Sequence, residues 1–355
     1  MKMDFRSFAE KVLKNEGFFF IAEVSNNHLG DFDRLKKIIA AAKKSGAHAV
    51  KIQTYSASSL CLEIAKDKHQ IRSGPWAGQS YWDLYKSMEV PLYWSLAARD
   101  FAESIGIPIF SSPFSPSDVK YLVGNGYDML KVASGEFACP ELIDSIIDIG
   151  VPFMASTGFA DKQEIEWLNK RLKGIANNNQ LWCLFNCVSN YPSGINQLNL
   201  GKFGLLSNYS NRIGLSDHSL DSLSVLVSFL AGARIFEKHL TLSREDGGPD
   251  AFFSLEPDEL KDHILTLKLA ISNPTLEQAS LVSAISDNTG KASLNFSRSL
   301  YAKMYINQGS SISLDNVGSF RPPHQEPAFV LDQIIGKKAK NNINPGDPVY
   351  TTSVI

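Results

Sequence analysis

Residues 212–239 read RIGLSDHSLDSLSVLVSFLAGARIFEKH, and this stretch holds one complete strand, helix and strand pattern. Two short apolar runs, at residues 213–217 and 235–239, flank an amphipathic segment. The runs end at or next to an imidazole, His218 after the first and His239 within the second. Short apolar runs that alternate with amphipathic segments are typical of strand-helix units on a parallel sheet.

The same alternation extends from about residue 18 to residue 272. Amphipathic segments such as 32–44 separate eight apolar runs, at residues 18–24, 49–54, 108–112, 130–134, 152–157, 181–187, 213–217 and 235–239. Eight such units favour a closed barrel over an open doubly wound sheet. The sequence therefore predicts a protein of the α/β class with a (β/α)8 TIM barrel over residues 1–272.

The pattern changes after the barrel. Asn273-Pro274 opens a polar stretch, which we interpret as a linker over residues 273–297. Residues 298–355 carry short apolar runs with Gly-Ser and Pro-Gly turns and no strand-helix unit. This predicts a small β-rich domain, which we expect to cover the rim of the barrel.

Composition limits the class of partner. The chain has 355 residues, a net charge of −2 and no long basic run, which argues against a nucleic-acid or membrane partner. The first apolar cluster, residues 18–22, is too short for a membrane span, so we expect a cytoplasmic protein. The four cysteines (Cys61, Cys139, Cys183 and Cys187) lack the spacing of a zinc or redox motif and are expected to be free thiols.

Polar side chains gather at the C-terminal ends of the predicted strands, the rim where TIM barrels carry their active sites. They are Glu23, Lys51, Gln53, Ser112, Lys131, Ser134, Ser156, Ser216, His218 and His239. Lys51 and Lys131 interrupt apolar runs, and an unpaired buried ammonium is costly unless an anion meets it. We therefore expect an anionic substrate to lie between these two lysines.

His218 and His239 occupy matching strand-end positions. Two neutral imidazoles without a nearby cysteine would hold a divalent ion and leave positions open for substrate oxygens, as a Lewis-acid site requires. A strand-end histidine that only stabilises the fold is the alternative for either residue taken alone.

Several spaced motifs resemble the sialic acid synthases and their pseudaminic and legionaminic acid relatives over nearly the whole chain. They are AEVSNNH (22–28), VKIQT (50–54), SSPF (111–114), KVASGE (131–136), STG (156–158), GLSDH (214–218), EKH (237–239) and GPD (248–250). FRP (320–322) and IGKKA (335–339) are similar to the antifreeze-like (SAF) domain of that family. The small C-terminal domain is therefore expected to be a SAF domain.

The resemblance implies a reaction in which phosphoenolpyruvate condenses with an open-chain N-acetylated amino sugar, giving a nine-carbon 2-keto acid and phosphate. It assigns phosphoenolpyruvate to Lys51, Ser112, Lys131, Ser134, Ser156, Ser189 and Ser216, and the sugar to Gln53, Tyr191 and Arg321. It makes Glu23, Glu136 and Asp250 the catalytic carboxylates and leaves open which is the base. His218 and His239 would bind the divalent metal, with Mn²⁺ as first choice and Mg²⁺ or Co²⁺ as alternatives.

The resemblance also implies an assembly. Arg321 would reach from the small domain of one subunit into the site of its neighbour and bind the N-acetyl carbonyl, so we expect a domain-swapped homodimer. Two positions depart from the family pattern. Residues 323–327, PHQEP, replace a glycine-containing loop, and Asn186 stands where many members carry histidine.

The motifs also bear on the choice of sugar. Residues 25–28, 76–86 and 247–254 are similar to the pseudaminic branch, whereas 134–136 are similar to the sialic and legionaminic branches. We favour a pseudaminic acid synthase acting on a 6-deoxy-2,4-diacetamido hexose. The alternatives are an N-acetylneuraminate or N,N'-diacetyllegionaminate synthase, a synthase of a shorter 3-deoxy sugar acid, and a non-catalytic sugar-binding protein.

Overall fold

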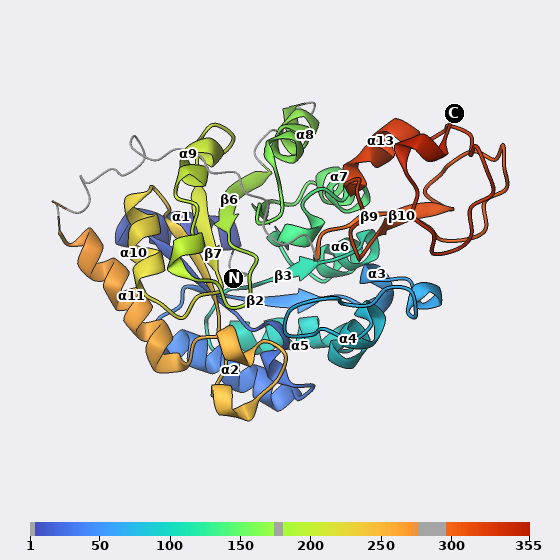
Figure 1. Cartoon of the computed structure of the whole chain (residues 1–355). Coiled ribbons are helices and arrows are strands. Elements are labelled where there is room, and N and C mark those ends of the chain that lie inside the picture. Colours follow the sequence, from blue (N-terminus) through green and yellow to red (C-terminus); the bar gives the residue numbers. More distant parts are fainter. Residues whose placement is uncertain (1–3, 174–179, 274, 276–295) are drawn as a thin grey trace.

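Eight parallel strands form a closed barrel in sequence order, which confirms the predicted fold (Figure 1). The computed structural model describes residues 4–173, 180–273, 275 and 296–355. The last strand pairs with the first and so closes the barrel. The strands are β1 (Phe19–Glu23), β2 (Ala49–Thr54), β3 (Ile109–Pro113), β4 (Leu130–Val132), β5 (Phe153–Ser156), β6 (Leu181–Cys187), β7 (Ile213–Asp217) and β8 (Ile235–His239).

Helices surround the barrel because each has one apolar stripe. The helix at 32–44 begins at Asp31, whose carboxylate accepts hydrogen bonds from two backbone N–H groups, and it buries Leu35, Ile38, Ile39 and Ala42. The main helices of the barrel domain are α1 (Phe5–Glu16), α2 (Phe32–Lys44), α3 (Ala57–Leu60), α4 (Tyr81–Met88), α5 (Tyr93–Ser104), α6 (Pro116–Gly124), α7 (Pro140–Ile149), α8 (Lys162–Lys173), α9 (Gly201–Ser207), α10 (Leu223–Leu230) and α11 (Pro257–Ile271).

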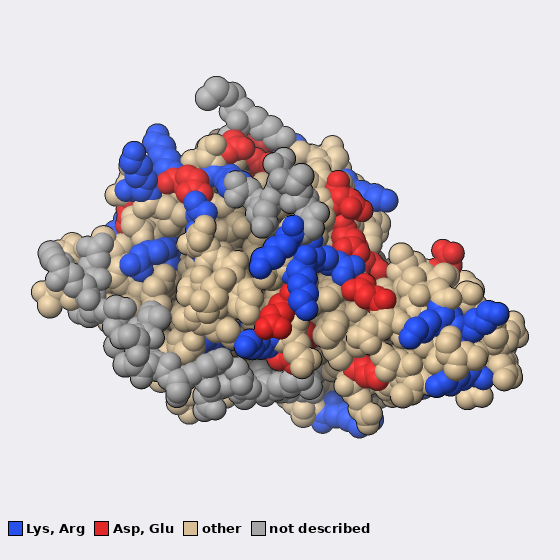
Figure 2. Space-filling view, turned by 90° about the horizontal axis from the view of Figure 1, so that it is seen from above, with Lys and Arg blue, Asp and Glu red and all other residues tan. Residues whose placement is uncertain are grey.

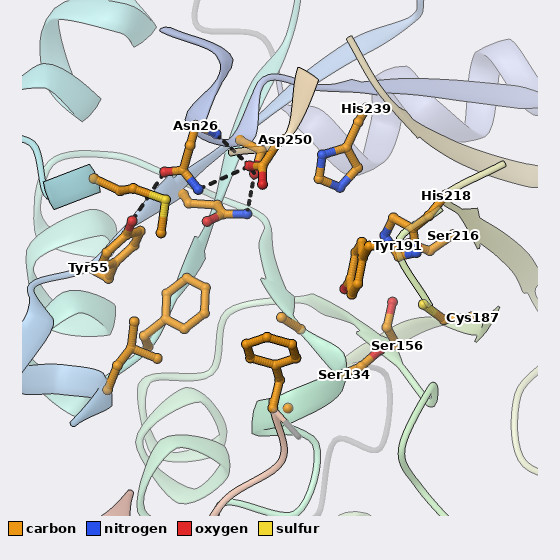
Figure 3. Close-up of a pocket in the computed structure, with 18 of the residues that line it drawn as sticks. Asn26, Tyr55, Ser134, Ser156, Cys187, Tyr191, Ser216, His218, His239 and Asp250 are labelled. Atoms are coloured by element: carbon orange, nitrogen blue, oxygen red, sulfur yellow. Dashed lines mark hydrogen bonds between the residues drawn. The ribbon is translucent and has the colours of Figure 1, made fainter. Parts of the chain in front are cut away.

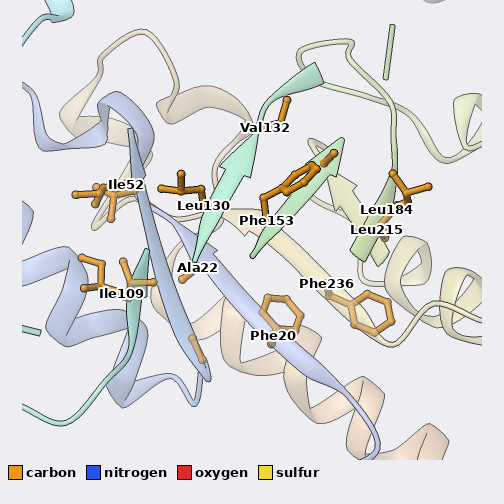
Figure 4. Packing of buried hydrophobic residues seen from close by; sticks show 14 of the residues in the cluster. Phe20, Ala22, Ile52, Ile109, Leu130, Val132, Phe153, Leu184, Leu215 and Phe236 are labelled. Atoms are coloured by element: carbon orange, nitrogen blue, oxygen red, sulfur yellow. The ribbon is translucent and has the colours of Figure 1, made fainter. Parts of the chain in front are cut away.

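Alternation along the strands separates two apolar layers. Side chains that point outward pack against the helices, and Figure 4 shows Phe20, Ala22, Phe153 and Phe236 among them. The inward side chains at the N-terminal end of the barrel form a second cluster, which includes Phe19, Ile21, Phe110, Met154 and Ile235. Phe5 and Ala9 of α1 belong to this cluster and close that end of the barrel.

Polar side chains follow the inward apolar ones at the opposite end. Because successive inward residues are two apart, Glu23 follows Ile21, Lys51 follows Ala49, and Glu237 follows Ile235. The register places Glu23 level with Lys51 on one side and with His239 on the other. The fold therefore gathers the polar strand ends into one ring at the C-terminal rim.

The C-terminal domain has its own core. β9 (Ser299–Ala302) pairs antiparallel with β10 (Val317–Phe320), and Leu300, Ile312 and Val317 pack with the short helix α13 (Leu331–Ile334). In Figure 1 this domain lies beside α6 and α7. The predicted linker, residues 273–297, falls mostly outside the described residues, so its boundaries stay a prediction.

The surface and the cysteines agree with the composition. On the face shown in Figure 2, basic and acidic side chains are interspersed over most of the surface. All four cysteines are buried and free. None of the described helices combines the length and the apolar character that a bilayer crossing needs.

A buried ion pair lies outside the barrel wall, directly behind the two strand-end histidines. Lys238 contacts the Asp217 carboxylate and donates to the backbone oxygen of Ser219 at 2.7 Å. Ser224 of α10 donates to the same carboxylate at 2.5 Å. This pair joins β7 and β8 to α10 and so fixes the strand ends that carry His218 and His239.

Lys238→Met should therefore lower the free energy of unfolding by about 3–5 kcal/mol, because it leaves the buried Asp217 carboxylate without its cation. The measurement is the thermal unfolding midpoint of the purified protein. Lys36→Met is the matched control, since Lys36 forms an exposed ion pair with Asp33 and should change stability by less than about 1 kcal/mol. Equal midpoints for the two variants would contradict this account.

Candidate active site

The ring of polar side chains opens into a pocket at the C-terminal rim (Figure 3). Most of the residues predicted for the site line it: Lys51, Gln53, Lys131, Ser134, Ser156, Tyr191, Ser216, His218, His239, Asp250 and Arg321. Four predicted residues do not line it. Glu23, Ser112, Glu136 and Ser189 are buried behind the lining residues.

The floor of the pocket is lined by Lys51, Lys131 and Glu237, and Glu23 lies buried behind it in contact with Lys51. Lys51 Nζ lies 2.5 Å from Glu23 Oε2 and 3.7 Å from Glu237 Oε1. Lys131 Nζ lies 3.8 Å from the same oxygen of Glu237 and donates to Ser156 Oγ at 2.5 Å. We expected these two lysines to lack an anionic partner within the protein. The structure differs, because carboxylates at the ends of β1 and β8 balance their charge.

Glu237 is the functional residue that the sequence analysis missed. It lies in β8 two residues before His239, so both side chains point into the barrel. The motif EKH carries the signal, because a glutamate two residues before a strand-end histidine shares its face of the strand. Ser216 Oγ donates to Glu237 Oε1 at 3.0 Å, while the buried Glu237 Oε2 has no hydrogen-bond partner among the residues that the structure describes.

Burial sets the protonation of this floor. It raises the pKa of Glu23 to about 7, against the opposing effect of Lys51, and the carboxylate of Glu237 adds to the rise. Burial also lowers the pKa of Lys131, although Glu237 acts in the opposite direction. Glu23 can therefore gain or lose a proton near neutral pH, which is the property a proton carrier needs.

Hydroxyl groups converge on one wall. Gly158 has no side chain, and a Cβ there would lie 2.0 Å from Ser189 Oγ and 2.7 Å from Ser134 Oγ. The Gly158 N–H donates to Ser134 Oγ at 3.2 Å. Ser112 lies lower, where Lys51 donates to its Oγ at 3.3 Å. Three of the predicted serines, Ser134, Ser156 and Ser216, thus present hydroxyls to the pocket, whereas Ser112 and Ser189 lie buried behind the lining residues.

The two histidines face each other across the rim, with ring centroids 5.2 Å apart. His218 Nδ1 lies 2.8 Å from the Val188 carbonyl oxygen, so it donates there and leaves the lone pair on Nε2. His239 Nδ1 is buried and meets no hydrogen-bond partner within the described part of the chain. Burial lowers the pKa of both rings, which keeps them in the neutral form that binds metals.

This donor set fits a divalent ion with open positions. Among the described residues, no group of three histidine, cysteine, aspartate or glutamate side chains is arranged to hold an ion. An ion here would therefore rest on His218 and His239 and take its other ligands from water or substrate.

Arg321 reaches the pocket from the C-terminal domain of the same chain. Its Nη2 donates to Glu136 Oε1 at 2.5 Å, and its Nη1 contacts the Tyr85 hydroxyl. Arg298 Nε donates to the same Glu136 oxygen at 3.0 Å. Glu136 therefore lies behind Arg321 and not in the pocket wall where the catalytic carboxylates were expected. Exchange of this domain between subunits stays a prediction.

The two departures from the family pattern have structural roles. Residues 323–327 pack on their own domain, where His324 Nε2 lies 3.0 Å from the Leu300 oxygen, and Arg321 still reaches the pocket. Asn186 donates to the Asn199 backbone oxygen at 2.9 Å and does not line the pocket. Neither departure removes a lining residue.

Aromatic side chains form part of the pocket wall. Trp76 and Phe253 line it, together with Phe296, whose ring lies 5.5 Å from that of Trp76. Tyr81 and Trp82 do not line the pocket but pack in the apolar cluster that also contains Trp76 and Phe296, and Phe252 is partly exposed. The aromatic residues of this region thus divide between pocket wall and packing.

Gly135 makes the placement of Arg321 possible. A Cβ at this position would lie 2.3 Å from the Phe296 oxygen and 2.7 Å from Arg321 Nη2. Gly135→Ala should therefore displace Arg321 from the pocket and cost about 1–3 kcal/mol of stability through crowding. A crystal structure of the variant measures the displacement. Gly124→Ala is the control because nothing lies within 4 Å of its Cβ, and an unmoved Arg321 in Gly135→Ala would refute the prediction.

Comparison with known proteins agrees with this arrangement. The profile of the NeuB family matches residues 38–272, and that of the SAF domain matches residues 297–355. The chain is 34% identical to the pseudaminic acid synthase of Campylobacter jejuni (strain 81-176), over 93% of this chain and 94% of that protein. It is 29% identical to the N,N'-diacetyllegionaminic acid synthase of Legionella pneumophila, over 92% of each.

Among solved structures, the spore coat polysaccharide biosynthesis protein SpsE of Bacillus subtilis has the same fold. The TM-score is 0.78, with 24% identity and 95% of both chains covered. The extent of the family match, together with a relative above 30% identity over nearly the full length, places the chain in one family. The chain belongs to the NeuB family and ends in a SAF domain.

Proposed function

We propose that the protein is a pseudaminic acid synthase, which condenses phosphoenolpyruvate with an N-acetylated amino sugar to a nine-carbon 2-keto sugar acid and phosphate. One observation carries the proposal: two lysines, a wall of hydroxyls and two neutral imidazoles converge in one pocket. Similarity over 93% of the chain to a pseudaminic acid synthase supports this substrate class.

Phosphoenolpyruvate would bind at the floor. Its phosphate and carboxylate can accept hydrogen bonds from Lys51, Lys131 and the serine hydroxyls. The lysines already face Glu23 and Glu237, so an added anion favours proton uptake by a carboxylate. Glu23 suits this role because its pKa lies at about 7. A protonated Glu23 would leave Lys51 free to neutralise the substrate.

The sugar would bind above the floor with its aldehyde near the two imidazoles. A divalent ion on His218 and His239, with Mn²⁺ preferred over Mg²⁺ or Co²⁺, would supply Lewis-acid polarisation of that aldehyde. Gln53, Tyr191 and Asp250 offer polar atoms to the sugar chain, and Arg321 offers donors to an N-acetyl carbonyl. These residues orient the aldehyde carbon toward C3 of phosphoenolpyruvate.

The bond changes follow from this arrangement. The C3 carbon of phosphoenolpyruvate bonds to the aldehyde carbon, whose oxygen gains a proton. Water adds to the cationic C2 and loses a proton. The bond from the resulting tetrahedral C2 to the phosphate oxygen then breaks as the C2 hydroxyl gives up its proton, which leaves the 2-keto group and phosphate. We assign proton transfer at the floor to Glu23, which contacts Lys51, and proton transfer beside the sugar to Asp250, which lines the pocket.

The aromatic residues in the pocket wall favour a sugar with an apolar end. Trp76, Phe253 and Phe296 can pack against a 6-deoxy methyl or an acetyl methyl group. This supports the 6-deoxy-2,4-diacetamido hexose of the pseudaminic branch. The similarity to a legionaminic acid synthase makes the corresponding stereoisomer the second candidate.

Phosphate release tests the function directly. The purified protein with phosphoenolpyruvate and Mn²⁺ is offered N-acetylmannosamine and 2,4-diacetamido-6-deoxy hexoses of different configuration. We expect kcat/KM for the pseudaminic precursor to exceed that for N-acetylmannosamine by at least about 100-fold, because a hydroxyl placed against aromatic rings loses its hydrogen bonds. Phosphate release with none of the sugars would overturn the proposal.

Metal dependence should rest on the two imidazoles. Chelation should abolish turnover, and Mn²⁺ should restore it. His218→Ala and His239→Ala should each lower activity at least about 100-fold and reduce Mn²⁺ binding in calorimetry. Full activity of the chelated enzyme without added metal would contradict the assignment. His263→Ala is the control, since His263 lies in α11 and does not line the pocket.

Mixing inactive variants decides whether Arg321 serves its own or a neighbouring subunit. In a domain-swapped homodimer, His239→Ala mixed with Arg321→Ala should recover about a quarter of wild-type activity, because half of the dimers carry one complete site. Native mass spectrometry verifies subunit exchange. No recovery after verified exchange would show that Arg321 completes the site of its own chain, as it does in the single chain described above.

A further inference from the structure

The loop after β1 contains a buried serine with an unusual backbone conformation. Ser25 opens the 3-10 turn Ser25–His28 with a φ of 49°, in the left-handed region that non-glycine residues rarely adopt. It is 4% exposed and lines the pocket. A strained residue at this place needs a compensating interaction.

Ser25 bonds to two carboxylates at once. Its backbone N–H donates to Glu23 Oε1 at 3.0 Å, and its Oγ donates to Asp250 Oδ2 at 2.5 Å. Gln53 Nε2 donates to the same Oγ at 3.0 Å. Ser25 therefore links the floor of the pocket, the end of β2 and the loop after β8.

The bonds to Asp250 are one-sided. Ser25 Oγ, Asn26 N and Asn26 Nδ2 all donate to Oδ2, the last two at 3.0 Å each (Figure 3). Tyr55 in turn donates to Asn26 Oδ1 at 3.1 Å and holds that amide in place. None of these three bonds is made to Oδ1, so the protein holds the carboxylate of this pocket-lining residue through one oxygen.

The two loops also pack against each other beside this contact. Asn27 Nδ2 donates to the Leu240 oxygen at 3.0 Å and to Ser254 Oγ at 2.8 Å. Gly248, with a φ of 106°, approaches Leu29 so closely that a Cβ there would lie 2.4 Å from the leucine Cδ2. The loop that carries Asp250 therefore packs closely against the loop that carries Ser25.

We propose that Ser25 is a positioning residue that fixes the Asp250 carboxylate, so that its Oδ1 meets a hydroxyl of the bound amino sugar. The backbone conformation of Ser25 is what allows its N–H and its Oγ to face Glu23 and Asp250 together. This inference rests on the proposed function, because it assigns the sugar to the Asp250 side of the pocket.

Two substitutions separate the hydroxyl from the backbone conformation. Ser25→Ala removes the hydroxyl and keeps the cost of positive φ, whereas Ser25→Gly removes both. Each should lower kcat/KM for the sugar about 10- to 100-fold, the value of one hydrogen bond to a charged group, while KM for phosphoenolpyruvate stays within about twofold. Ser25→Gly should nevertheless unfold about 2–4 °C above Ser25→Ala. Ser228→Ala is the control, since Ser228 is a buried serine of α10 whose hydroxyl has no hydrogen-bond partner in the described residues.

A purely structural role predicts a different result, in which activity follows stability and Ser25→Gly is more active than Ser25→Ala. That outcome, or a Ser25→Ala enzyme within about threefold of wild type, would overturn the proposal. Crystal structures of both variants give a readout that needs no activity: Asp250 should lose its single orientation, and an unchanged carboxylate in both would refute the role. Failure of the wild type to release phosphate with any sugar would instead refute the proposed function, and the orientation of Asp250 would still decide the role of Ser25.

Discussion

Charge neutrality inside the barrel is the constraint on which the rest of the site depends. Glu23, Lys51, Lys131 and Glu237 are all buried, and an isolated charge at such a depth would cost several kcal/mol. The two lysines and two glutamates balance one another's charge, which offsets the cost of burying each of them. Under the proposed function, an arriving anion would break this balance, and its binding would be coupled to proton uptake or to a shift of a carboxylate. The raised pKa of Glu23 makes proton uptake the easier of the two.

The apolar layer below the charges makes the arrangement rigid. Phe19, Phe110 and Met154 fill the barrel interior beneath the lysines, and α1 closes its lower end. Each charged side chain extends from a strand whose preceding inward residue is locked in this layer, so its position is set before substrate arrives. Such preorganisation is what electrostatic catalysis requires, because the groups need no reorientation during the reaction.

Strand order, barrel closure and most of the pocket lining could be predicted because they depend on local periodicity. The polar residues that end the eight runs meet because parallel strands end on one rim. The pairing of Lys51 with Glu23 and Glu237 could not be read in this way, since it depends on inward orientation in three different strands. The position of Glu136 behind Arg321 could not be predicted either, because these two residues are 185 positions apart in the sequence. The role of Ser25 could not be predicted, because a loop sequence does not reveal that a serine has a positive φ.

Two arginines of the C-terminal domain, Arg298 and Arg321, connect that domain to the barrel through Glu136. Arg298 is satisfied by Glu136 and by the backbone oxygens of Ser59, Phe114 and Ser319. Arg321 shares the same carboxylate, yet its buried Nε has no hydrogen-bond partner in the described part of the chain. A ligand oxygen that accepts from this Nε would remove an unmet cost of burial. Binding at the pocket and docking of the C-terminal domain would then stabilise each other by the same free energy, because such coupling is reciprocal. Arg298 fixes the domain on the rim, whereas Arg321 makes its docking sensitive to what the pocket contains.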